Sequence, residues 1–264
     1  IPQRSGKKET TLFIRNPIGL VIRLTRVTII SWLIGLVVLG ASYGAAYGEI
    51  EVFFTGNEMF ELMLSMSSGT HPIDQYTSML MVIMSIASAI PGILMILRLR
   101  VEEKHSRIDH LLTSTVSRKT AFAAFYLPAL LMGTLSLISS ILGMWGAAYM
   151  TLDNPLSLSK TMQSGLVYLP AIWIMIALAA TLIAFIPRWT SLIWGYLSIS
   201  FFLIYFGGLM QLPDWTFKLS PFGFIPQLPE DDINYVTLLL MVIAGIALSM
   251  IAFIQYRRRD LLPN

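Results

Sequence analysis

The stretch that decides the fold is QYTSMLMVIMSIASAIPGILMIL (75–97) followed by RLRVEEKHSRIDHLLTSTVSRK (98–119). The first part carries no charged residue, whereas nine residues of the second are Asp, Glu, Lys or Arg. A helix needs roughly 20 apolar residues to cross the hydrocarbon core of a bilayer, so 75–97 predicts a transmembrane helix. The run 120–152 is again free of charge and predicts a second span. The charged segment 98–119 between them must therefore lie outside the membrane.

The whole chain repeats this pattern of long charge-free runs. Its 264 residues are 55% hydrophobic and 12% charged, whereas a soluble domain carries about 25% charged residues. Backbone groups in lipid must be hydrogen-bonded within the segment, and these runs lack the alternation of barrel strands. We therefore predict an all-α polytopic membrane protein, a single transmembrane domain over 1–264 with six transmembrane helices. The predicted spans are 27–48, 75–97, 120–152, 161–187, 189–213 and 233–256.

The basic residues identify the cytoplasmic side. With six spans both termini and the segment 98–119 fall on one side, which holds 16 of the 18 Lys and Arg residues. Only Lys160 and Lys218 fall on the other side, together with 10 of the 15 acidic residues. By the positive-inside rule, both termini are predicted to be cytoplasmic. The pI near 9.2 therefore reflects topology and does not indicate binding to nucleic acid.

Segments outside the spans receive separate predictions. Residues 1–15 are polar and basic and are interpreted as a linker. Asn16-Pro17 is a favourable helix start, because Asn caps and Pro fits the first helical position, so 16–26 predicts a short amphipathic helix in the inner interface. The alternative is that these residues simply begin the first span. Residues 214–232 contain several prolines and aromatic residues and are predicted to cap the outer end of the bundle.

The predicted spans contain no Asp, Glu, Lys, Arg or His. Ionisable residues inside a membrane usually mark ion pathways or proton relays, so their absence argues against a proton- or sodium-driven carrier and against a selective ion channel. The chain also has no cysteine, which excludes disulfides and thiolate metal sites. This pattern favours a protein that takes its energy from a partner and handles an apolar or amphipathic solute.

One motif suggests catalysis. Glu102-Glu103-x-x-x-Arg107 matches the EExxxR signature of the CAAX-protease-like membrane peptidases, which also need histidines further along the chain. The last histidine here is His110, so we interpret Glu103 and Arg107 as an ion pair one helical turn apart. No phosphate-cradling GxxxxGK[ST] sequence occurs. The chain is therefore predicted to bind neither ATP nor a metal and not to be an enzyme by itself.

The charged segment also has a helical pattern. Val101, Ile108, Leu111 and Leu112 can share one face of a helix, and charged residues flank this apolar ridge. An amphipathic helix of this kind suits docking into the groove of a partner protein. The alternative, a helix lying on the lipid surface, is disfavoured by the mixed charge, because such helices prefer a basic polar face.

The order of spans and several quoted stretches resemble the ABC-2-type permeases of ATP-driven exporters, in particular those described as polyketide-antibiotic or multidrug exporters. The resemblance covers essentially the whole chain, and the charged segment is its most specific part. The matching stretches are RNPIGLVIRLTR (15–26), LRLRVEEKHSRIDHLLTSTVSR (97–118), LPDWTFKLSPFGFIPQLP (212–229) and YRRRDLLP (256–263).

The resemblance implies a permease half in the plasma membrane of a bacterium that exports an antibiotic, drug or lipid. It implies the C-terminal six-helix half of a longer permease, with a separate six-span subunit as the rival interpretation. The partners would be a second six-helix half and a dimer of ABC ATPase subunits, through which alone ATP and Mg would act. The segment 98–119 would be the coupling helix that rests on the ATPase. Its predicted coupling residues are Glu102, Glu103, Arg107, Ile108, Leu111 and Leu112.

Polar and helix-bending residues within two spans could line the path of the solute, although ordinary packing between helices would use the same residue types. These candidates are Ser85, Ser88, Pro91, Tyr196, Ser200 and Tyr205. Two functions from other classes stay open: an intramembrane peptidase built on Glu102-Glu103-x-x-x-Arg107, and a non-transporting membrane scaffold or immunity protein. A scaffold would show no ATP-dependent export when it is paired with an ATPase.

Overall fold

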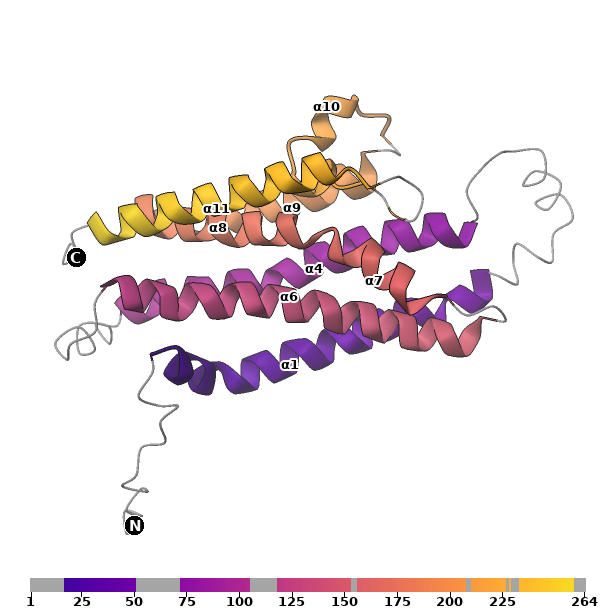
Figure 1. The fold of residues 1–264 in the computed structure, drawn as a ribbon, viewed down its shortest axis with the longest axis horizontal. Helices are drawn as coiled ribbons and strands as arrows, with labels where there is room; N and C mark the ends of the chain where they lie inside the picture. Colours follow the sequence, from indigo (N-terminus) through magenta and orange to yellow (C-terminus); the bar gives the residue numbers. More distant parts are fainter. Residues whose placement is uncertain are drawn as a thin grey trace, which may run out of the picture.

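Long helices lie side by side along the length of the molecule (Figure 1). The computed structural model describes residues 17–50, 72–104, 118–152, 156–207, 210–226, 228 and 233–258, and every regular element within them is a helix. The elements are α1 (Pro17–Ala45), α4 (Pro72–Lys104), α6 (Arg118–Thr151), α7 (Leu158–Leu166), α8 (Leu169–Phe185), η2 (Pro187–Trp189), α9 (Leu192–Phe206), α10 (Asp214–Phe217), η3 (Pro221–Phe224) and α11 (Tyr235–Arg258).

Within the described ranges, 5 helical segments are long and apolar enough to cross a membrane. They are Pro17–Ile50, Ile73–Glu103, Arg118–Thr151, Leu158–Phe185 and Tyr235–Arg258. The prediction of an all-helical polytopic membrane protein is thus confirmed, whereas six full spans are not. The shortfall is at 189–213, where the only long helix is α9 with 15 residues. At 1.5 Å per residue α9 is about 22 Å long, shorter than the roughly 30 Å hydrocarbon core.

The backbone conformation of residues just after α9 prevents the helix from continuing. Gln211 has a φ of 52°, which is left-handed backbone, and Pro213 follows with no amide hydrogen to continue a helix. The described part of the predicted cap, 214–232, then forms α10 and η3, which pack against α9. The hydroxyl of Tyr196 in α9 donates to the carbonyl of Leu219 at 2.9 Å and ties this segment to the bundle.

Two other predicted boundaries differ from the structure. Residues 17–26 run without a break into the rest of α1, so a separate interface helix over 16–26 is not confirmed; these residues are the first turns of a helix that ends at Ala45. The predicted span 161–187 is divided at residues 167–168 into α7 and α8. Pro170 lies in the first turn of α8 and has no amide hydrogen to donate to α7, which explains the break.

Glycines bring α1 and α6 into contact at the level of the backbone. A Cβ atom on Gly40 would overlap the carbonyl oxygen of Ser140, and one on Gly44 would overlap the carbonyl oxygen of Met144. A Cβ atom on Gly143 of α6 would in turn overlap the carbonyl oxygen of Val37. Only residues without a side chain allow helices to approach so closely, as is common between membrane helices. α1 therefore packs mainly on α6.

The remaining helices continue the layer from α6. α4 packs on both α6 and α8, and α11 packs along α8. A Cβ atom on Gly133 of α6 would be 2.8 Å from Cγ2 of Ile172 in α8, so small residues again set the spacing. α4 and α8 form the interior of the bundle, and Ile176, Ala177 and Ala180 of α8 are fully buried. α1 and α11 lie at the periphery and expose many apolar side chains.

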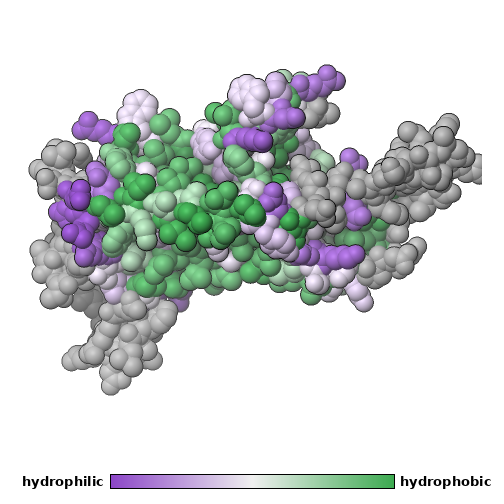
Figure 2. Space-filling model, turned by 45° about the horizontal axis from the view of Figure 1, so that its top comes forward, coloured by the Kyte–Doolittle hydropathy of each residue, from purple (hydrophilic) through white to green (hydrophobic). Residues whose placement is uncertain are grey.

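The two ends of the bundle differ in charge. We call the end that holds Arg98, Arg118 and Arg257 the basic end. The C-terminal ends of α4 and α11 and the N-terminal end of α6 all lie there (Figure 1). Figure 2 shows a hydrophobic middle, with hydrophilic residues gathered towards the ends. This distribution suits a protein whose middle is surrounded by lipid.

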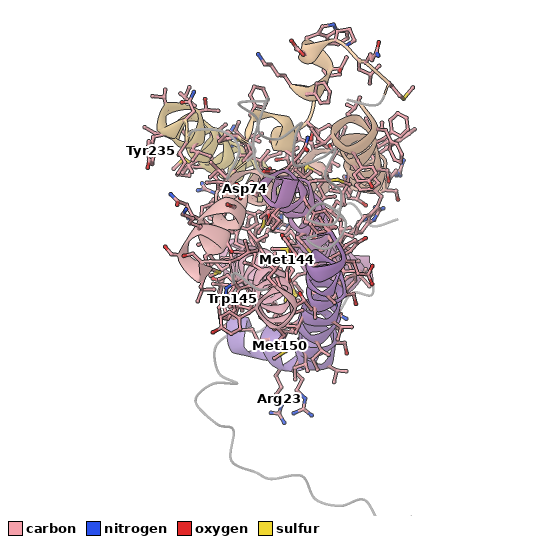
Figure 3. The ribbon with its side chains drawn as sticks, turned by 90° about the vertical axis from the view of Figure 1, so that its right-hand side faces the viewer. Arg23, Asp74, Met144, Trp145, Met150 and Tyr235 are labelled. Atoms are coloured by element: carbon pink, nitrogen blue, oxygen red, sulfur yellow. The ribbon has the colours of Figure 1, made fainter. Side chains whose placement is uncertain are left out.

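At the opposite end, tyrosines join α4 to the chain that follows α1. Tyr47 is fully buried, and its hydroxyl lies 2.7 Å from that of Thr77 and 3.9 Å from the sulfur of Met144. Tyr76 donates to the carbonyl of Tyr43 at 3.2 Å. In Figure 3, Met144 lies inside the bundle, whereas the side chain of Arg23, near the start of α1, points away from it. α1 and α4 make little other direct contact, so these side chains join the two helices at that end.

Candidate functional site at the basic end of the bundle

The predicted coupling segment begins as a continuation of α4. Residues 98–104 form the last turns of that helix, and α6 begins at Arg118. Glu102 and Glu103 are therefore placed by the structure, and both are partly buried. The other predicted coupling residues lie outside the described residues: Arg107, Ile108, Leu111 and Leu112. We call the last turns of α4 (98–104) and the first turns of α6 (118–126) the two feet of the charged segment.

The α4 foot is hydrogen-bonded to three different parts of the bundle. The guanidinium of Arg98 donates to the hydroxyl of Thr28 in α1 at 3.0 Å. The guanidinium of Arg100 donates to the hydroxyl of Thr190, between η2 and α9. The carboxylate of Glu103 accepts from the hydroxyl of Tyr256 in α11 at 2.5 Å. The foot is thus fastened to three elements that are far apart in the sequence.

The α6 foot meets α11 through aromatic rings. Phe122 is 2% exposed, and its ring centroid lies 5.2 Å from that of Tyr256 and 5.8 Å from that of Phe253. On its own helix Phe122 stacks on Tyr126, whose hydroxyl is hydrogen-bonded to that of Ser249 in α11. Aromatic pairs of this geometry contribute about 0.5–1.5 kcal/mol beyond the area that they bury. The contact therefore fastens the start of α6 to the end of α11.

Tyr256 is the residue where the contacts of the two feet meet. It is 5% exposed, its hydroxyl donates to Glu103 of the α4 foot, and its ring touches Phe122 of the α6 foot. Hydrogen bonds to charged groups contribute about 1.5–3 kcal/mol, more than those between neutral groups. The partner of Glu103 found in the structure is thus Tyr256, on another helix, and the predicted pair with Arg107 falls outside the described residues.

Inspection of the sequence missed Arg98, Arg100, Phe122 and Tyr256 as site residues. A signal for the aromatic contact was present: Phe122 and Tyr126 are four residues apart, and Phe253 and Tyr256 are three apart, so each pair shares a helix face. The hydrogen bonds of the two arginines have no such local signal, because they depend on which helices lie beside α4.

The predicted solute-path residues fall on two helices. Ser85, Ser88 and Pro91 are buried in α4, which packs on α6 and α8, and the hydroxyl of Ser85 donates to the carbonyl of Val82 at 2.7 Å. On α9, Ser200 is fully buried. The ring of Tyr205 stacks on Phe201 with centroids 5.4 Å apart, and Tyr196 holds the segment after α9. Their role in a solute path stays a prediction.

Comparison with known proteins identifies the family. The family described as "Multidrug efflux system permease Rv1217c, C-terminal domain" matches residues 14–257. The multidrug efflux system permease protein Rv1217c of Mycobacterium tuberculosis is 30% identical to this chain over 266 residues, which cover 98% of this chain and 48% of that protein. The chain thus spans about half the length of this relative. It belongs to the family of C-terminal domains of Rv1217c-type multidrug efflux system permeases, which confirms the resemblance to ABC-2-type exporter permeases.

Proposed function

We propose that this chain is the membrane-spanning permease half of an ATP-driven exporter in the plasma membrane of a bacterium. ATP and Mg are bound by a separate dimer of ABC ATPase subunits, and a second six-helix half completes the permease. The basic end faces the cytoplasm, as the positive-inside rule requires. Family membership supports the permease role. The attachment of the charged segment supports its coupling to the ATPase.

The observation that carries the coupling proposal is the way in which the charged segment is attached. Both of its feet are bound to other helices, through Arg98, Arg100 and Glu103 on one side and Phe122 on the other. A segment attached only by its own backbone could move without consequence for the rest of the bundle. One that is bound to α1, to Thr190 and to α11 transmits a push to all of them, because packed helices resist compression.

The polarity of the interior supports an apolar or amphipathic solute. All the buried polar residues found in the described ranges are Ser and Thr, and none of the buried residues is charged. A charged solute would need charged or strongly polar partners at membrane depth. Methionines such as Met81, Met84 and Met175 are fully buried, and their flexible side chains adapt to varied apolar shapes. A hydrophobic antibiotic, drug or lipid is therefore the solute class we propose.

The proposal is tested with the complete permease and its ATPase in proteoliposomes, with export of the hydrophobic dye rhodamine 6G as the measurement. We expect Leu111→Asp combined with Leu112→Asp to abolish copurification of the ATPase or to leave ATP hydrolysis without export. Ser106→Asp is the matched control, because helical spacing places residue 106 away from the apolar ridge. Normal export by the double variant would exclude the coupling role. ATP-independent dye movement, or none in the wild type, would exclude an ATP-driven exporter.

A further inference from the structure

The residue Tyr256 has a position that no sequence motif assigns. α4 ends at Lys104 and α6 begins at Arg118, so the two feet flank residues 105–117 in the sequence. The hydroxyl of Tyr256 donates to Glu103 Oε1 of the α4 foot at 2.5 Å. Its ring centroid lies 5.2 Å from that of Phe122 of the α6 foot. A displacement of either foot therefore acts directly on this one side chain.

The packing of α11 connects the contacts of Tyr256 to α8. α11 packs mainly along α8 and makes only a small contact with α6. That contact runs along the basic half of the helix, through Phe253 against Phe122 and through Ser249 hydrogen-bonded to Tyr126. Tyr256 stands at its basic end, next to the charged segment. Movement of the feet can thus be passed to α11, and through it to α8, by the contacts of Tyr256, Phe253 and Ser249.

The chemistry of the contact suits a link that is made and broken. Glu103 is partly buried, and its carboxylate accepts the hydrogen bond from the buried side chain of Tyr256. Its hydrogen bond to a phenol is short and directional, so a small displacement of α4 weakens it steeply. The ring contact with Phe122 has no such dependence on direction. Tyr256 therefore combines a contact that persists with one that responds to the position of the α4 foot.

We propose that Tyr256 is the positioning residue through which movement of the charged segment is passed to α11 and α8. The inference rests on the proposed function, because it requires that the ATPase moves that segment. In this role the hydroxyl of Tyr256 follows α4 and the ring follows α6, and α11 moves with both. The residue does not contact ATP or the solute.

The experiment measures dye exported per ATP hydrolysed by the complete permease with its ATPase in proteoliposomes. Tyr256→Phe removes the hydroxyl and keeps the ring, so we expect this ratio to fall about fivefold or more, while the ATPase still copurifies. Glu103→Ala should lower the ratio at least as much, and adding Tyr256→Phe to it should lower the ratio no further, because both changes remove the hydrogen bond between the two residues. Glu103→Gln keeps an oxygen that accepts from the phenol and should stay within about twofold of wild type.

Tyr149→Phe is the control, because it removes a phenol hydroxyl that is not part of this contact from a 54% exposed residue of α6. Its ratio should equal that of the wild type. If Tyr256→Phe or Glu103→Ala keeps the wild-type ratio, or if Glu103→Gln is as poor as Glu103→Ala, the role of Tyr256 is wrong while the permease function stands. If the wild type neither exports nor retains the ATPase, the proposed function itself fails. Melting temperatures of all variants separate a coupling defect from misfolding.

Discussion

Buried hydroxyl groups in this bundle fall into two kinds. Most donate to a backbone carbonyl one turn earlier, as Ser85 does to Val82 and Ser140 to Leu137. Ser88 and Ser136 are instead fully buried with no hydrogen-bond partner for the side-chain oxygen among the described residues. A buried hydroxyl without a partner costs about 1–3 kcal/mol, so such a group either serves the function or is tolerated as a small packing residue.

The structure favours packing for Ser88. It lies where α4 meets Gly133 of α6, in a region that Ile172 and Ile176 of α8 fill closely. We expect Ser88→Ala to leave export unchanged and to leave the free energy of unfolding unchanged or raise it by up to about 1 kcal/mol. Unfolding in detergent and dye export measure the two quantities. A fall in export at unchanged stability would instead place Ser88 on the solute path.

The candidate site shows which residue roles the sequence predicts. Glu102 and Glu103 could be predicted because they lie in a charged segment that directly follows the charge-free run 75–97. The partner of Glu103 could not be predicted, because Tyr256 is 153 residues away and the pairing depends on the packing of α4 against its neighbours. Local charge patterns thus identify the charged segment, whereas the residues that its feet contact are set by tertiary packing.

Among the elements, the contact between α1 and α6 depends on glycines at a spacing of four. Gly40, Gly44 and Gly48 follow one another one turn apart, and a Cβ atom on the first two would overlap the backbone of α6. The spacing is visible in the sequence, although α6 as the partner is not. Close backbone approach makes α1 and α6 a rigid pair on which α4 is fastened at both ends.

This packing predicts opposite effects for two glycines of the same helix. Gly44→Ala should destabilise the protein by about 1–3 kcal/mol, because the added methyl group overlaps Met144 of α6. Gly35→Ala is the matched control, since a Cβ atom there meets nothing within 4 Å. It should be neutral or stabilising by up to about 1 kcal/mol, as expected for alanine in place of glycine within a helix. Equal effects in unfolding experiments would contradict the close contact of α1 with α6.

Two element boundaries show where reasoning from hydropathy ends. The run 161–187 is apolar throughout, so it predicts one span, yet Pro170 divides it into α7 and α8. The run 189–213 is also apolar, yet its helix ends at Phe206 before the left-handed Gln211. Hydropathy reports the environment of a segment but not where its backbone stays helical: Pro170 falls at a break, whereas Pro91 lies inside the unbroken α4. Both interruptions lie in segments that the composition alone would join.

At the scale of the whole molecule, the direction of each helix follows from the fold. α8 and α11 run side by side with their C-terminal ends at the basic end (Figure 1). The chain between them must therefore return to the opposite end, and α9 is the only long helix in the described part of that connection. α9 lies along this return path, but its 15 residues do not make a full span, so the fifth span stays a prediction. The number of passes predicted from the sequence is thus compatible with 5 long helices and one short one.

Sidedness can be tested with single introduced thiols, because this chain contains no cysteine, and the unsubstituted complete permease gives the background labelling. Trp215 in α10 is 64% exposed, and Arg258 ends α11 at the basic end. In intact cells, a membrane-impermeant maleimide should label Trp215→Cys of the complete permease and leave Arg258→Cys unlabelled, because the positive-inside rule places the basic end in the cytoplasm. Permeabilised cells should show both labelled, which controls for reactivity. Labelling of Arg258→Cys with Trp215→Cys left unlabelled would mean that α9 does not return the chain across the membrane or that the orientation is reversed. Labelling of both thiols in intact cells would mean that α11, the long helix between them, does not cross the membrane.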